Sequence, residues 1–199
     1  MSKVKKLLEA NETIACLLTE SINNIGNSTK LILNNGQTII IHKSISSVLK
    51  EIAEFYALDL KILRKKQQIY THSKYYVPLP LSKNLLLIPI KTKVPLVPKD
   101  PSLSYINYYS IKEIDKYNPI VYLSNGVKIK CLNSLDTLKK RYNQGQICHK
   151  LMDVSNKYMD YSHLRPATRG DLEKLREEML LYQQELIKKL IEGKFTDIK

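Results

Sequence analysis

The chain has 199 residues, of which 43% are hydrophobic and 26% charged, so it is long and apolar enough to fold around one substantial core or two small ones. It carries a net charge of +13 and has no run approaching the roughly 18 apolar residues that span a bilayer. Three widely spaced cysteines, Cys16, Cys131 and Cys148, exclude a disulfide scaffold and give no closely spaced metal ligands. We therefore expect a cytoplasmic protein without membrane attachment or metal.

The first predicted element is a β-hairpin over residues 31–41. Two β-prone runs flank Asn35-Gly36, and this pair is a strong hairpin signal because a type I′ turn needs positive φ at both central positions. Ser44 then precedes apolar residues at helical spacing, from Ile45 to Tyr56. Serine at this place satisfies a free backbone N–H, so a serine-capped helix should follow the hairpin.

Residues 76–90 predict two extended segments joined by a turn at residues 82–84. Pro78, Pro80 and Pro89 cannot donate ladder hydrogen bonds, so we expect them at sheet edges or strand ends. Residues 105–109 predict a further strand.

Residues 121–131 repeat the first hairpin, with Asn125-Gly126 at the turn and Ser134 before a second helix. The repeat covers residues 31–60 and 121–150, and it reflects either a duplication or the commonness of Asn-Gly hairpins. The fold class that follows is α+β, with antiparallel β-hairpins each followed by a helix.

The C-terminal segment, residues 164–199, differs from the α+β domain expected over residues 1–163. Thr168 and Asp171 approximate a capping box, and Gly193 should end one long amphipathic helix. Its apolar residues follow a coiled-coil spacing for about two heptads. Packing on the core and self-association both remain open, and the candidate oligomerisation residues are Leu172, Leu175, Met179, Leu186 and Leu190.

Positive charge is concentrated in one stretch, Lys30–Lys99, where twelve lysines and arginines face only three acids, Glu51, Glu54 and Asp59. The last 36 residues, 164–199, are nearly neutral, with eight bases and seven acids, so the excess is not a uniform lysine bias. Tyrosines accompany the cations around residues 60–76. An unbalanced cationic segment with aromatic neighbours is typical of a nucleic-acid surface, although it can also be a solvated face.

Signals for catalysis are weak. The four histidines are scattered without partners at metal spacing, and Cys148-His149 are neighbours whose side chains point apart on a regular element. No phosphate-binding glycine loop or hydrolase motif occurs, and clustered carboxylates are missing from the basic half. We expect no enzyme activity, no cofactor and no small-molecule substrate.

The order of these features resembles the competence transcription factor (ComK) family of low-GC Gram-positive bacteria. The similarity covers roughly residues 13–145, and Tyr105 stands where the family has a tryptophan. The matching segments are Thr13-Ile14-Ala15, Arg64-Lys65, residues 78–92, Tyr105-Ile106, Ile111–Ile114 and Val121–Tyr142.

The resemblance implies a transcription activator of competence and transformation that binds paired A/T-rich boxes of double-stranded DNA as an oligomer, largely through the minor groove. Narrow A-tract minor grooves are strongly negative, so inserted Arg or Lys gains electrostatically there. Groove contacts are expected from Arg64, Lys65 and Lys66, and phosphate contacts from Lys74, Lys91 and Lys93. The full set of candidate DNA-binding residues is Lys61, Arg64, Lys65, Lys66, Lys74, Lys91, Lys93, Lys139, Lys140 and Arg141.

Two alternatives remain open. A LytTR-like DNA-binding domain over residues 105–150 would confine DNA contact to the second half of the chain. An interaction or adaptor protein would act through its C-terminal helix, and its basic face would be incidental.

Overall fold

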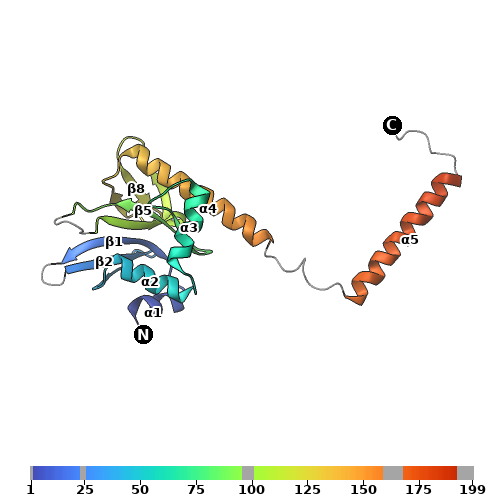
Figure 1. The fold of residues 1–199 in the computed structure, drawn as a ribbon, viewed down its shortest axis with the longest axis horizontal. Helices are drawn as coiled ribbons and strands as arrows, with labels where there is room; N and C mark the ends of the chain where they lie inside the picture. Colours follow the sequence, from blue (N-terminus) through green and yellow to red (C-terminus); the bar gives the residue numbers. More distant parts are fainter. Residues whose placement is uncertain (1, 23–25, 96–100, 159–167, 192–199) are drawn as a thin grey trace. The chain divides into compact units, whose positions relative to one another are not determined.

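The computed structural model describes residues 2–22, 26–95, 101–158 and 168–191, and it divides into two compact units, Met1–Ser155 and Asn156–Lys199. The first unit contains a six-stranded antiparallel sheet in the order β3-β2-β1-β6-β5-β4 and a three-stranded sheet in the order β7-β8-β9 (Figure 1). The described strands are β1 (Ile14–Ile22), β2 (Gly26–Leu33), β3 (Thr38–Ile41), β4 (Leu79–Ser82), β5 (Leu85–Lys91), β6 (Leu103–Asn107), β7 (Ile111–Ile114), β8 (Ile120–Leu123) and β9 (Lys128–Lys130). The described helices are α1 (Lys3–Glu9), α2 (Ile45–Phe55), α3 (Leu60–Thr71), α4 (Leu135–Tyr158), α5 (Arg169–Ile191) and the 3-10 turn η1 (Tyr108–Ser110). The predicted α+β class is confirmed.

The six-stranded sheet is buried on both faces. Successive strand residues point to opposite faces, so Leu17 and Leu31 join a core cluster with α1 and α2, whereas Cys16 and Ile32 join a second cluster. That second cluster also contains residues of the three-stranded sheet and of α4, among them Val121, Leu123, Ile129 and Leu138. The first and second halves of the chain therefore both contribute residues to the second core cluster.

Both predicted hairpins form, but their turn type differs from the prediction. In each turn the glycine alone has a positive φ, 86° at Gly36 and 83° at Gly126, and its N–H donates to the leucine three residues earlier at 3.0 Å. Three-residue loops of this kind combine a type I turn with a glycine bulge. The type I′ prediction was wrong because a further residue, Asn34 in the first turn, enters the loop and takes up the bend.

The two hairpin turns also touch each other. The Asn125 side-chain amide donates to the Leu33 carbonyl at 2.9 Å, and the Ser110 hydroxyl donates to the Asn34 side-chain oxygen at 2.7 Å. The two sequence-similar hairpins are therefore adjacent in the fold as well as alike in their turns.

The predicted serine caps are present. The Ser44 hydroxyl accepts from Ser47 N–H and the Ser134 hydroxyl accepts from Thr137 N–H, both at 3.3 Å. The extended segments at residues 76–90 form β4 and β5. Pro80 lies in the edge strand β4, and Pro89 lies in β5 beyond the residues that β4 pairs. Pro89 therefore lies at a local edge of the sheet, as predicted, because β4 does not pair with it.

Helix α5 begins after Thr168, as predicted, and is described as far as Ile191; the predicted end at Gly193 lies outside the described residues. Its described apolar side chains are exposed, with 58% of Leu172, 53% of Leu175 and 58% of Met179 accessible. The predicted seam residues Leu186 and Leu190 lie outside the side chains that the structure describes.

Candidate nucleic-acid interface

Helix α3 presents a row of cations to solvent. Its N-cap is Asp59, whose carboxylate accepts from Lys61 N–H at 2.7 Å and Ile62 N–H at 2.9 Å. These backbone hydrogen bonds, that from Ile62 first, hold the pKa of Asp59 below its usual value. Leu60 and Leu63 pack against the first core cluster, so the remaining helix face is left outside. The exposed cations of α3 are Lys61, Arg64, Lys65 and Lys66.

The three acids near this helix are already engaged. Glu54 pairs with Lys5 at 3.5 Å, Glu51 pairs with Lys43, and Asp59 caps α3. Within the described ranges, no carboxylate lies within 4.0 Å of the α3 cations. The positive charge that the sequence placed here is therefore not neutralised by ion pairing in the fold.

A tyrosine-rich loop, residues 72–76, follows α3 and extends the cationic face. The helix ends at His72 with a left-handed φ of 46°, and the Gln68 side chain donates to the Lys74 carbonyl at 2.7 Å. The Lys66 ammonium lies 5.8 Å from the centre of the Tyr70 ring, and that of Lys74 lies 5.4 Å from the Tyr75 ring. The tyrosines that accompany the lysines in the sequence therefore form cation–π pairs with them on an exposed surface.

Helix α4 meets α3 and this loop. The buried Cys148 thiol of α4 donates to the Gln67 side-chain oxygen of α3 at 2.9 Å. The Arg141 guanidinium donates to the Tyr76 carbonyl at 2.6 Å and stacks 4.7 Å from the centre of the Tyr76 ring. In Figure 1 the ribbon of α3 crosses that of α4, and the Gln67–Cys148 hydrogen bond shows that the two helices are in contact. We call this region, formed by α3, residues 72–76 and Arg141 of α4, the α3–α4 corner.

The charges of two arginines act on the pKa of Tyr105. Burial raises the pKa of Tyr105, while the charge of Arg64, with a side-chain hydrogen bond, and the charge of Arg141 oppose that rise. Burial in turn lowers the pKa of Arg141, although its guanidinium stays protonated. The positive charges of Arg64 in α3 and Arg141 in α4 therefore both favour the ionised form of Tyr105.

The predicted DNA-binding residues fall into three places. The α3–α4 corner brings together Lys61, Arg64, Lys65, Lys66, Lys74 and Arg141. Lys139 and Lys140 are exposed on α4 and point away from its buried side, which carries Leu138 and Cys148.

Lys91 and Lys93 lie at the end of β5 rather than beside α3. Lys91 N–H donates to the Asn133 side chain at 2.7 Å, just before α4, and the Lys93 ammonium donates to the Ser21 hydroxyl of β1. The predicted DNA-binding cations therefore do not all gather in the α3–α4 corner.

Tyr76 and Tyr105 contribute to this corner in ways the sequence did not indicate. Tyr76 has a left-handed φ of 57°, which is unusual for a bulky residue, and its carbonyl and ring both contact Arg141. Tyr105 is 6% exposed and comes from the central strand β6. In the sequence, the tyrosine pair Tyr75-Tyr76 beside the lysines was the one feature that could have indicated a role for Tyr76.

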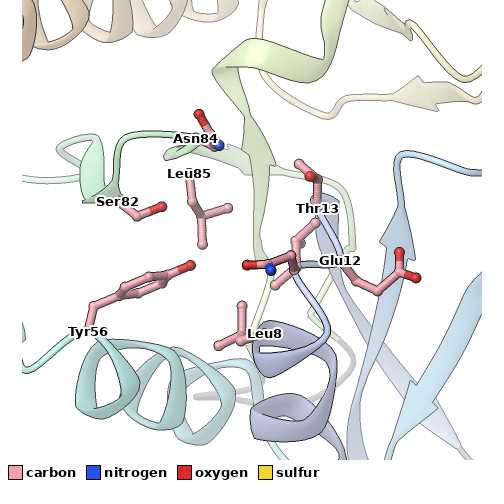
Figure 2. A pocket seen from close by; sticks show the side chains of 9 residues that line it. Leu8, Glu12, Thr13, Tyr56, Ser82, Asn84 and Leu85 are labelled. Atoms are coloured by element: carbon pink, nitrogen blue, oxygen red, sulfur yellow. The ribbon is translucent and has the colours of Figure 1, made fainter.

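The structure also contains two shallow cavities near these elements. A groove of about 410 Å³ between α2 and α3 has charges of both signs in its lining, the cations Lys50, Lys61 and Arg64 and the acids Glu54 and Asp59. A second pocket of about 240 Å³ lies between α1, the end of α2 and the β4–β5 turn (Figure 2). Tyr56 extends into it from α2, and its lining has one carboxylate, Glu12, and no cation. The second pocket is not part of the cationic surface.

The buried cysteines are poor nucleophiles. Burial raises the pKa of Cys16 and of Cys131 to about 12 and that of Cys148 to about 11. Cys148 faces Gln67, whereas its neighbour His149 lies against Tyr109, with the Tyr109 hydroxyl 3.2 Å from its Nδ1. In the part of the chain that the structure describes, no group of His, Cys, Asp or Glu could hold a metal, and no helix is long and apolar enough to cross a membrane.

Comparison of the chain with family models, curated proteins and solved structures gives no match. We therefore infer a function from the geometry of the α3–α4 corner.

Proposed function

We propose that this protein is a transcription regulator of the competence type that binds A/T-rich double-stranded DNA. The observation that carries the proposal is the α3–α4 corner, where cations from two helices and the loop between α3 and β4 gather without a carboxylate partner among the described residues. Such a surface attracts a phosphate backbone because each Lys or Arg replaces a condensed counterion.

The tyrosines of the corner support nucleic acid over other polyanions. Tyr75 is 64% exposed and Tyr76 is 45% exposed, each beside a cation. Aromatic rings next to cations suit deoxyribose and base edges as well as phosphates, whereas a simple polyanion needs charge alone. Narrow A/T-rich minor grooves would favour arginine at this corner.

The shared core supports a binding unit that includes the first half of the chain. Val121 and Leu123 of β8 pack in the same cluster as Ala15 and Ile32 of the six-stranded sheet. A separate LytTR-like domain at residues 105–150 would leave these apolar residues uncovered. We therefore favour DNA contact through the whole first unit.

A binding titration tests the proposal. Length-matched A/T-rich and G/C-rich duplexes are titrated with the full chain at two salt concentrations. We expect tighter binding to the A/T-rich duplex than to the G/C-rich duplex. The affinity should also fall steeply as the salt concentration rises, with a slope of log affinity against log salt of about −0.9 for each phosphate neutralised. Weak binding that responds little to salt would exclude a DNA-binding function.

A second candidate, an interaction protein, is favoured by one observation. Helix α5 exposes Leu172, Leu175 and Met179 at the spacing of a coiled-coil seam. Removal of residues 164–199 separates the two functions: DNA affinity per first unit should survive if the α3–α4 corner binds DNA, and self-association should be lost if α5 pairs with a second copy.

A further inference from the structure

We propose that helix α3 enters the major groove of A/T-rich DNA, where Ile62 and Ile69 contact the methyl groups of thymine. This inference rests on the proposed function, since it names how the protein distinguishes A/T-rich from other duplexes. Thymine alone among the four DNA bases presents a methyl group in the major groove. The contact therefore adds a direct reading of bases to the minor-groove preference expected for arginine.

The first argument is the exposure of the two isoleucines. Ile62 is 67% and Ile69 is 71% exposed, and among the large apolar side chains described in the first unit only Tyr117 is more exposed. Neither isoleucine belongs to the two core clusters of the described residues, whereas Leu60 and Leu63 of the same helix pack against the first cluster. Both isoleucines are therefore available to a partner.

The second argument is where the isoleucines lie on the helix. Leu60 and Gln67 mark its inner side, because Leu60 packs against the core and the buried Gln67 accepts a hydrogen bond from the Cys148 thiol of α4. At about 100° of rotation for each residue, Ile62 and Ile69 both lie roughly opposite this inner side. The two isoleucines therefore form the outermost line of α3.

The third argument is the charge on either side of this line. Lys65 and Lys66 are exposed, follow Ile62 by three and four residues, and therefore flank the isoleucine line on its two sides. Within the described ranges, neither lysine has a carboxylate within 4.0 Å. An apolar line between two rows of positive charge is complementary to the major groove, whose rims are phosphates and whose floor carries the thymine methyl groups.

The pattern on α3 differs from that of a helix that binds protein or lipid. A protein-binding helix repeats apolar residues at the third or fourth position as well as the seventh, as Leu172, Leu175 and Met179 do in α5. On α3 both intermediate positions are lysines. A helix that lies in a lipid surface needs a broad apolar face, whereas the lysines leave only a narrow line here. These differences favour a DNA duplex as the partner.

The dimensions of α3 fit a groove. The helix has 12 residues and is fixed at its start by the Asp59 cap and along its inner side by the Gln67–Cys148 hydrogen bond. The major groove of B-DNA is about 12 Å wide and admits an α-helix. Ile62 and Ile69 lie about 10 Å apart along the helix axis, which is roughly three base-pair steps of about 3.4 Å. The two side chains can therefore contact different base pairs of one A/T run.

The first experiment compares two duplexes of one A/T-rich sequence, one with thymine and one with uracil at every thymine position. Uracil lacks only the methyl group, so the phosphates and the minor-groove acceptors are the same in both. The full chain should bind the thymine duplex roughly 15-fold more tightly, as expected for burial of two methyl-sized groups. Equal affinities would overturn the inference while the proposed function stands. A full chain that does not bind the thymine duplex would exclude the proposed function as well.

The second experiment repeats this comparison with I62A/I69A. Both residues are exposed and alanine has the higher helix propensity, so the first unit should remain folded, which a thermal melt checks. The variant should bind the two duplexes with affinities within about twofold of each other, because the methyl contacts are lost. The control Y117A removes an even more exposed apolar side chain between β7 and β8 and should retain the full ratio. A ratio that survives in I62A/I69A would overturn the inference.

Two further measurements separate the isoleucines from the lysines and DNA from lipid. K65Q/K66Q should weaken binding to both duplexes alike and keep the ratio, because phosphate contacts do not distinguish thymine from uracil. A ratio that disappears with the lysines would contradict the assignment to the isoleucines. Vesicles containing phosphatidylserine test the competing partner: vesicle binding that I62A/I69A abolishes, together with equal affinities for the two duplexes, would assign the isoleucines to a lipid surface and overturn the inference.

Discussion

Helices α3 and α5 both expose much of their surface, but they expose different chemistry. The cations of α3 have no acid in the same helix, whereas α5 mixes both signs and contains an Arg169–Glu173 pair at 3.4 Å. On α5 the exposed residues Leu172, Leu175 and Met179 follow a seam; on α3 exposed Ile62 and Ile69 lie among lysines. Under the two proposed functions, charge balance, more than the number of charges, distinguishes the polyanion surface of α3 from the protein-binding surface of α5.

The largest expected effect tests this difference in charge balance. The triple variant K65Q/K66Q/K74Q should lower the log–log salt slope of DNA binding by up to about 2.7, because up to three phosphate contacts are lost. The variant K174Q/R176Q/K188Q on α5 removes the same net charge and should leave DNA affinity within about twofold. Fluorescence anisotropy with a labelled A/T-rich duplex measures both. Equal losses in the two triple variants would mean that net charge alone controls binding.

The next effect concerns the apolar residues of α5. The variant L175Q/M179Q should weaken self-association roughly 100-fold or more, because two seam side chains leave a buried interface. Light scattering across a concentration series measures the change. L180Q/L181Q makes the same apolar-to-glutamine change outside the seam, at residues 49% and 65% exposed, and should have little effect. A chain that is monomeric before substitution would remove α5 as an oligomerisation element.

The smallest effect concerns helix capping. D59A should lower the melting temperature of the first unit because α3 loses its N-cap, whereas T168A lies in the second unit and should leave that melt unchanged.

The same carboxylate predicts a pH dependence. The folded-state pKa of Asp59 is depressed, so its contribution to stability is present above its ordinary pKa near 3.8 and is lost as pH falls through the lower folded value. In D59N this part of the pH dependence should vanish, since asparagine caps without titrating. Melting temperatures measured from pH 6 to pH 2 provide the comparison, and parallel curves for the two proteins would show that Asp59 does not contribute.

Local hydrogen-bonding rules explain what the sequence could predict. Asn35-Gly36, Asn125-Gly126, Ser44 and Ser134 act on backbone groups within a few residues, so both hairpins and both helix starts were predictable. The exact turn was not, because type I′ and bulged loops use the same residues and differ by one position in the strand pairing.

The helical structure of α3 and the arrangement of the candidate site were harder to predict from the sequence. The sequence marked residues 60–74 as cationic but predicted no helix there, since few of its apolar residues are buried and its stability depends on the Asp59 cap and on packing of Leu60 and Leu63. The contact between Tyr76 and Arg141 joins residues 65 positions apart. The sequence showed that residues 60–74 are rich in cations. Only the packing of α4 against α3 shows that Arg141 lies near this segment in the fold.

The contact between the two hairpin turns has a consequence for the energetics of association. Because Asn125 holds Leu33 and Ser110 holds Asn34, the halves of the first unit are aligned during folding and lose that freedom before a partner arrives. A rigid body of this kind avoids the ordering cost that a flexible pair of modules meets on complex formation. Weakening the turn contact, for example with N125A, should therefore raise that ordering cost and lower the affinity in the duplex titration, even though residue 125 lies outside the α3–α4 corner.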